Sequence, residues 1–145
     1  MKSYEIYRIH ILAIMFIAFS GVCSAENEET PLFIKGSTKV SAEQVFELAN
    51  EHPELTIVDS RIKGDREKGY IESSISLPDT KTNCASLSKV LPSKEVAALF
   101  YCNGVNCGRS GKAIKIALNC GYKNLYWFRG GFEVWLKKGL PYMKE

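Results

Sequence analysis

The sequence is poor in the side chains that hold metal ions in small proteins. It contains two histidines, His10 and His52, and five cysteines, none of which forms a CxxC pair. Structural zinc sites are built from cysteines and histidines at short, paired spacings, so we expect no metal site in this chain. No other motif in the sequence calls for a cofactor.

The N-terminal apolar run is too short to cross a bilayer. Ile9 to Phe19 spans eleven residues, whereas a membrane-spanning helix needs about 20. Lys2 and Arg8 precede the run, and the small residues at 23–25 follow it, which is the layout of a secretory signal peptide. We therefore predict a signal peptide over residues 1–25, and export of a mature chain with no stable membrane insertion. The destination would be the periplasm in a Gram-negative bacterium, and an uncleaved anchor is the alternative.

The chain also lacks an excess of charge of one sign. Removing residues 1–25 leaves 17 basic and 15 acidic residues and a net charge of +2. No basic stripe interleaved with aromatic residues is present, so the composition gives no indication of nucleic-acid binding. A small anionic substrate is compatible with this balance, and no oligomeric state follows from it.

What the sequence does contain is an alternation of short apolar runs and amphipathic segments. The apolar runs are continuous, which is typical of strands buried on both faces of a parallel sheet. We predict an α/β fold in three layers, with a mostly parallel central sheet and helices on both faces. The predicted strands are 55–58, 96–101 and 125–128, and the predicted helices begin after Ser41, after Asn83 and near Ser110.

The most informative segment follows the apolar run 96–101. Cys102 comes directly after it, a loop with two glycines and one arginine follows, and a helix then begins. A cysteine between a strand end and a helix N-terminus is surrounded by backbone N–H groups that favour the thiolate. We therefore predict that Cys102 is a nucleophile, and that the loop around it binds the substrate. The predicted loop residues are Asn103, Gly104, Val105, Asn106, Cys107, Gly108, Arg109 and Ser110.

Several residues in and near this loop have more than one interpretation. Cys107 either resolves an oxidised or persulfidated Cys102, or is itself the nucleophile, or only lines the loop. A Cys102–Cys107 disulfide is a further alternative, although the loop could hold the two Cα atoms more than about 7 Å apart. Ser110 fits an N-cap as well as a catalytic role. Arg109 fits both anion binding and support of the loop. Outside the loop, we predict that Cys120 is a small core residue, and Cys84 has no identifiable partner.

The order of these motifs resembles that of the rhodanese family of sulfurtransferases. Asp59-Ser60-Arg61 is similar to the family's Asp-x-Arg, and 69–78 is similar to its Gly-His-Ile-Pro-Gly-Ala-Ile-Asn-Ile-Pro segment. Tyr101-Cys102 begins the active loop, and the segments 130–135 and 139–141 resemble the family's C-terminal signature. The resemblance covers a rhodanese-like domain over residues 36–142. The segment before it, residues 26–35, begins with a polar, acidic stretch, and we predict that it is a flexible mature N-terminus.

The resemblance also implies an activity. Cys102 would take a sulfane sulfur from a thiosulfate-like anion as a persulfide and pass it to a thiol or to cyanide. Loop amides would stabilise the persulfide, Arg109 would help to bind the donor, and Asp59 and Arg61 would support the site. The loop from Cys102 to Arg109 has eight residues, two more than in ordinary single-domain rhodaneses. This expansion leaves the substrate open. Export and the presence of two thiols on one loop suggest an alternative, a thiol–disulfide redox protein using Cys102 and Cys107, and a non-catalytic binding module of the same fold is a further one.

Overall fold

A fully parallel five-stranded sheet forms the centre of the protein in the computed structural model, which describes residues 30–144. Its strand order is β1-β5-β4-β2-β3, so β5, β4 and β2 lie inside the sheet. The predicted α/β fold with a parallel sheet is confirmed, whereas the predicted signal peptide, residues 1–25, lies outside the described residues. The elements are β1 Ser37–Lys39, α1 Ala42–Glu51, β2 Thr56–Asp59, α2 Lys63–Arg66, β3 Ile75–Ser76, the 3-10 turn η1 Asp79–Lys81, α3 Cys84–Val90, β4 Ala98–Tyr101, α4 Arg109–Asn119, β5 Leu125–Phe128 and α5 Gly131–Lys137.

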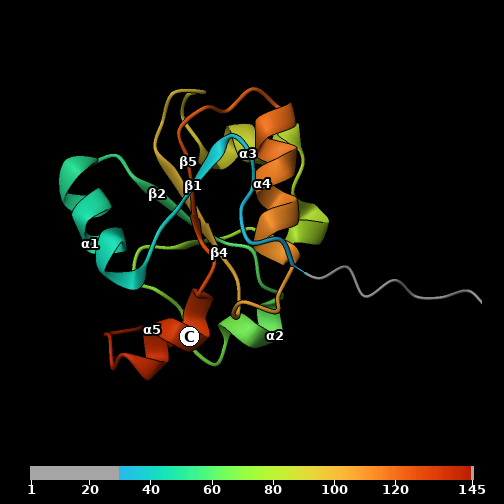
Figure 1. Ribbon diagram of the computed structural model, residues 1–145. Coiled ribbons are helices and arrows are strands. Elements are labelled where there is room, and N and C mark those ends of the chain that lie inside the picture. Colours follow the sequence, from blue (N-terminus) through green and yellow to red (C-terminus); the bar gives the residue numbers. More distant parts are fainter. Residues whose placement is uncertain (1–29, 145) are drawn as a thin grey trace, which may run out of the picture.

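Strand β4 shows why the predicted strands are continuous apolar runs. Ala98 and Phe100 pack in the cluster that α3 and α4 cover, while Leu99 and Tyr101 pack in the cluster that α1 and α5 cover. All four side chains are buried, because successive residues of a strand point to opposite faces and both faces carry helices. Figure 1 shows α1 on one side of the sheet and α3 and α4 on the other.

Two helix starts follow the predicted capping residues. The Ser41 hydroxyl accepts a hydrogen bond from the Gln44 N–H, and the Gln44 side chain bonds the Ser41 N–H in return, which completes a capping box at the start of α1. Asn83 and Ser86 form the same reciprocal arrangement at the start of α3. Both signals are local, so they could be recognised without knowledge of the packing.

A disulfide between Cys84 and Cys120 joins α3 to the end of α4, with the two Cα atoms 5.5 Å apart. The prediction that Cys120 is only a small core residue is therefore wrong, and Cys84 has a partner. The error has a simple cause: Cys120 does lie on the apolar stripe of its helix, but α3 packs beside that stripe and brings Cys84 within bonding distance.

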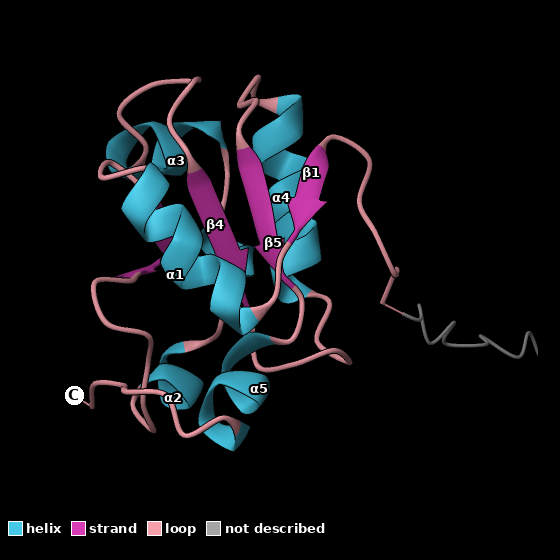
Figure 2. Cartoon of the chain, turned by 60° about the vertical axis from the view of Figure 1, so that its left-hand side comes forward, coloured by secondary structure: helices cyan, strands magenta, loops and turns pink. Residues whose placement is uncertain are grey.

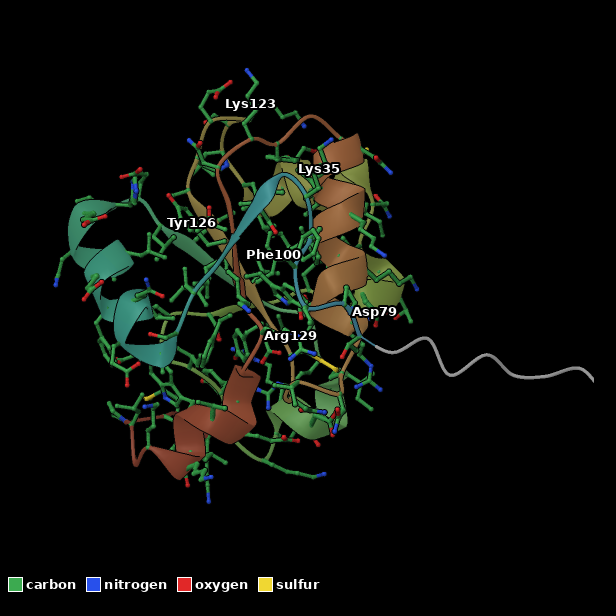
Figure 3. All side chains as sticks on the ribbon, viewed as in Figure 1. Lys35, Asp79, Phe100, Lys123, Tyr126 and Arg129 are labelled. Atoms are coloured by element: carbon green, nitrogen blue, oxygen red, sulfur yellow. A yellow bond between two sulfur atoms is a disulfide. The ribbon has the colours of Figure 1, made fainter. Side chains whose placement is uncertain are left out.

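The carboxyl ends of the strands all point to one end of the molecule, where α2 and α5 lie (Figure 2). Asp79 and Arg129 lie at this end, and Lys123 lies at the opposite one (Figure 3). Parallel α/β sheets bind ligands beyond the carboxyl ends of their strands, so this end is where a site is expected. Within residues 30–144, no helix has the length and apolar character needed to cross a membrane.

Candidate active site

The cysteine loop occupies the carboxyl end of β4, in the middle of the sheet. Cys102 follows the last strand residue, Tyr101, and only 1% of its surface is exposed. The loop then turns at Gly104, whose carbonyl accepts a 3.0 Å hydrogen bond from the Cys107 N–H, and α4 begins at Arg109. The predicted sequence of strand, cysteine loop and helix is therefore present, with the loop at the expected edge of the sheet.

Cys102 and Cys107 form a disulfide whose Cα atoms are 6.2 Å apart. This distance is within the range that a disulfide spans, so the geometric objection to pairing these two residues does not hold. The loop amides predicted to surround the Cys102 sulfur make no hydrogen bond to it within residues 30–144, where that sulfur is bonded to Cys107. The structure thus represents the oxidised state of the loop.

An open cavity of about 440 Å³ lies over the loop, and Cys107 faces it. Cys107 is half-buried, whereas Cys102 is almost fully enclosed and does not line the cavity. A molecule entering from solvent therefore meets the Cys107 sulfur first. The lining residues are Asn103, Asn106, Cys107, Gly108, Arg109 and Glu133. No group of three or more His, Cys, Asp or Glu side chains suited to a metal ion occurs in the described part of the chain.

Arg109 points toward two carboxylates that sequence reasoning did not identify. Its Nη1 atom lies 3.4 Å from Asp65 Oδ2, and its Nε atom lies 3.8 Å from Asp79 Oδ1. Lys112 also contacts Asp79, with Nζ 3.2 Å from Oδ2. The cations beside the loop are therefore balanced by acidic side chains. Asp65 is in a charged segment and Asp79 follows a proline, and neither position carries a motif that would reveal this role.

Asn103 connects the loop to the same acidic group. Its side-chain amide donates a 2.9 Å hydrogen bond to Asp65 Oδ2. This hydrogen bond holds the pKa of Asp65 below its ordinary value, against a smaller opposing effect of burial, and the positive charges of Lys68 and Arg109 add to the lowering. Asp65 thus carries a stable negative charge beside the loop and holds both Asn103 and Arg109.

Helix α5 fixes the other side of the loop. The Phe132 N–H donates to the Cys102 carbonyl at 2.9 Å, and the Glu133 N–H donates to the Asn103 carbonyl at 2.7 Å. Gly131 permits this approach because it adopts φ +59 and has no Cβ, which would otherwise lie against the loop backbone. The Glu133 carboxylate lies over Gly104, where a side chain would collide with it. Gly131 thus allows α5 to pack closely against the cysteine loop.

Ser110 has a different role from the N-cap considered for it. Gly108 is the N-cap of α4 and makes no side-chain capping bond. Ser110 lies in the first turn, is buried, and its hydroxyl accepts a 2.9 Å hydrogen bond from the Trp127 indole N–H. The serine therefore satisfies a buried donor on β5 and ties the start of α4 to the sheet. Trp127 lies far away in sequence, so only the packing reveals this partner.

Asp59 and Arg61 lie beneath the site in a buried network. Arg61 donates from Nε and Nη2 to the two Asp59 carboxylate oxygens, at 2.9 and 2.7 Å. Tyr101 donates its hydroxyl to Asp59 at 2.8 Å, and Arg61 packs over the Phe132 ring at 4.4 Å. Burial lowers the pKa of Arg61, but the Asp59 carboxylate outweighs it and raises that pKa above its ordinary value.

This network contacts two residues that adjoin Cys102. Tyr101 precedes Cys102 in the chain, and Phe132 donates its N–H to the Cys102 carbonyl. The Asp59–Arg61 pair therefore contacts these two residues rather than the cavity, and the supporting role predicted for it stays a prediction.

The first described residues reach the loop from outside. The Thr30 hydroxyl donates to the Val105 carbonyl, and Arg129 donates to the backbone carbonyl of Pro31 at 2.8 Å. Arg129 also bonds Thr30 at 3.2 Å. Thr30 thus contacts the tip of the loop, and Arg129 holds Thr30 and Pro31 in place. No sequence pattern indicated these contacts, because their partners lie some 75 to 99 residues apart.

Comparison with known proteins matches the chain to one family model. The model, described as a rhodanese-like domain, matches residues 41–138. A rhodanese domain-containing protein of Drosophila melanogaster, CG4456, is 29% identical over 107 residues, which cover 66% of this chain and 94% of that protein.

Solved structures show the same fold. The BH2092 protein of Bacillus halodurans superposes with a TM-score of 0.65 at 24% identity, over 74% of this chain and 77% of that one. A thiosulfate sulfurtransferase of Pseudomonas aeruginosa gives a TM-score of 0.60 at 22% identity, over 74% of this chain and 20% of that one. At these identities, the structural matches bear on the fold alone.

Proposed function

Since the chain belongs to the rhodanese-like family, we propose that it is a sulfurtransferase in which Cys102 carries a sulfane sulfur as a persulfide. In the first step, the Cys102 thiolate attacks the outer sulfur of a thiosulfate-like donor. A sulfur–sulfur bond forms to Cys102, the sulfur–sulfur bond of the donor breaks, and sulfite leaves with the electron pair. In the second step, a thiolate or cyanide attacks the outer sulfur of the persulfide, and the Cys102 thiolate leaves.

The observation that carries this proposal is the position of Cys102. It lies at the carboxyl end of the inner strand β4, with α4 starting after its loop and the α5 backbone bonded to its carbonyl. The N-terminal turn of α4 favours negative charge nearby, which supports a thiolate in the reduced loop. Arg109 and Lys112 are the cations beside the loop that would meet an anionic donor, with Asp65 and Asp79 already partnering them.

Mass spectrometry of the reduced, intact protein after addition of thiosulfate tests the proposal. We expect the mass to increase by one sulfur atom, and peptide mapping to find that atom on Cys102 in the first seconds of the reaction. Cys102→Ser should take up no sulfur, because no other nucleophile replaces the thiolate. The Cys84→Ser/Cys120→Ser double variant is the matched control, since it removes the two cysteines of the described chain that lie outside the loop. Uptake by Cys102→Ser together with loss of uptake in Cys107→Ser would reverse the assignment of the two cysteines.

The Cys102–Cys107 disulfide favours a second candidate function, thiol–disulfide exchange without sulfur transfer. Under this alternative the loop would pass electrons between dithiols and disulfides and would never carry an extra sulfur. Counting free thiols after purification without reductant tests it. Two free loop thiols would exclude this candidate. If several sulfur donors fail to load the protein and the loop also fails to exchange with dithiols, a non-catalytic binding module is left.

We also propose that the protein is exported, with cleavage after Ala25. The Cys84–Cys120 disulfide supports this proposal, because it joins two helices outside the cysteine loop and such bonds persist in oxidising compartments. Expression with residues 1–25 in a Gram-negative host, followed by fractionation and N-terminal sequencing, tests it. A mature chain beginning at Glu26 in the periplasm is expected. A full-length chain retained in the cytoplasm would contradict export.

A further inference from the structure

The two loop cysteines differ in how far solvent can reach them. Cys102 is 1% exposed at the end of β4, whereas Cys107 is half-buried and lines the open cavity with Arg109 and Glu133. A persulfide on Cys102 would therefore extend from an enclosed position toward the side of the loop where Cys107 lies. An acceptor from solvent must pass Cys107 before it reaches the persulfide.

The loop already holds the two sulfurs within bonding distance. The Gly104–Cys107 turn folds the chain back on itself, and the two Cα atoms are 6.2 Å apart. Asn103 and Arg109, one near each end of the loop, both bond Asp65, which keeps those ends in place. An intramolecular attack at such a distance has a high effective concentration and competes well with a dilute external acceptor.

The charges around the cavity do not provide an uncompensated cationic site for the sulfur to stay in. Arg109 is shared between Asp65 and Asp79, and Glu133 places a carboxylate on the cavity wall itself. A long-lived persulfide anion would gain little from these balanced charges.

Building on the proposed function, we propose that Cys107 is a resolving cysteine that discharges the Cys102 persulfide. The Cys107 thiolate attacks the inner sulfur, the one bonded to the Cys102 side chain. A bond forms between the two cysteine sulfurs and the bond to the outer sulfur breaks. The outer sulfur leaves with the electron pair and takes up the proton that the Cys107 thiol gave up, so it departs as hydrosulfide. The sulfane sulfur is reduced and the two cysteines become a disulfide, so the electrons balance without another reactant.

The Cys102–Cys107 disulfide in the structure is the product of this step. Because Cys107 lines the cavity, its sulfur is where reduction of the disulfide back to two thiols begins. A low-molecular-weight thiol entering the cavity attacks the Cys107 sulfur, and the enclosed Cys102 leaves as the thiolate. A second thiol then attacks the mixed disulfide at the sulfur of the first thiol, which frees Cys107 and releases an oxidised thiol pair. When no sulfur acceptor competes, the protein would thus release one hydrosulfide and oxidise two low-molecular-weight thiols to a disulfide in each cycle.

Comparing the wild-type protein with Cys107→Ser, both reduced and free of excess thiol, tests the proposal. Thiosulfate is the first donor and an organic hydropersulfide the second, and both mass and released hydrosulfide are followed over time. We expect Cys107→Ser to keep one added sulfur on Cys102. We expect wild type to lose the added sulfur, release one hydrosulfide per chain and end with a Cys102–Cys107 disulfide. The Cys84→Ser/Cys120→Ser double variant should behave as wild type.

The possible failures are distinguishable. If wild type retains the added sulfur as long as Cys107→Ser does, Cys107 does not resolve the persulfide, and the proposed sulfurtransferase function stands. If neither protein takes up sulfur from either donor, both proposals are overturned. Far-ultraviolet circular dichroism and Cys107→Ala, which should also retain the sulfur, separate a loss of the resolving thiol from a loss of the fold.

Discussion

The backbone N–H of Phe132 donates a 2.9 Å hydrogen bond to the carbonyl oxygen of Cys102, so the first turn of α5 is attached directly to the cysteine that leads the loop. The two residues are far apart in sequence, and they meet because β4 and β5 are neighbours whose carboxyl ends point the same way. The C-terminal helix is therefore part of the construction of the site, through its backbone and through the Phe132 ring that Arg61 packs over.

Gly131→Ala is expected to destabilise the protein and to displace the cysteine loop. The new Cβ would lie 2.8 Å from the Asn103 backbone, and alanine at φ +59 adds a conformational cost of about 1–2 kcal/mol. Gly139→Ala is the matched control, because Gly139 has φ +66 but open space around its Cβ position. Urea unfolding of both variants should give a clearly larger loss for Gly131→Ala, and equal losses would contradict the steric role of this contact.

Asn103→Ala is expected to raise the pKa of Asp65, because the Asn103 amide makes the largest contribution to its lowering. A lowered pKa in the folded state stabilises the fold above the ordinary carboxyl pKa, and this stabilisation disappears as the pH falls through the lowered value. The variant should therefore lose less stability on acidification than wild type does. Carboxyl titration by NMR measures the pKa directly, and an unchanged Asp65 titration would refute the assignment.

Asn106→Ala serves as the control for that experiment. Asn106 is an exposed amide in the same loop that lines the cavity, and it makes no hydrogen bond to Asp65 in the described chain. Its removal should leave the Asp65 titration where it is in wild type.

Ser110→Ala should cost about 1–3 kcal/mol of stability, because it leaves the buried Trp127 indole N–H without its acceptor. A double-mutant cycle with Trp127→Phe isolates this interaction, since phenylalanine removes the donor as well. Urea unfolding should show that Ser110→Ala costs less in the Trp127→Phe background than in wild type. Strictly additive effects of the two substitutions would mean that the hydrogen bond contributes nothing.

The Cys84→Ser/Cys120→Ser double variant should lose about 3–4 kcal/mol, as expected for a disulfide that closes a loop across a sequence separation of 36 residues. The loss arises mainly because the unfolded chain regains freedom. Unfolding of the variant and of wild type in urea, without reductant, measures the difference. Equal stability of the two proteins would show that α3 and α4 are held together by packing alone.

Much of the fold could be predicted because its signals are local. The buried strands are unbroken apolar runs, as at Ala98–Tyr101, and the capping residues Ser41 and Asn83 lie next to the helices they begin. The order of cysteine loop and helix after β4 was readable for the same reason. Capping and strand patterns depend on residues a few positions apart, so the chain alone contains them.

The surroundings of the cysteine could not be predicted in this way. Asp65, Asp79 and Glu133 carry no distinguishing pattern, and they reach the loop from three separate segments. The pairing of Cys84 with Cys120 was missed because an amphipathic position explains Cys120 equally well. Ser110 was considered as a cap because its partner, Trp127, lies in a separate element, strand β5.

The amino-acid sequence by itself determined the parallel α/β fold and the place of Cys102 after a buried strand, since both depend on the period of apolar residues and on short-range geometry. Only the tertiary structure decided that Cys107 lies within bonding distance of Cys102, that Cys84 pairs with Cys120, and that Arg109 is shared by two carboxylates. Such contacts depend on how separate elements pack and on where their side chains end, and neither is encoded in the local spacing of residues.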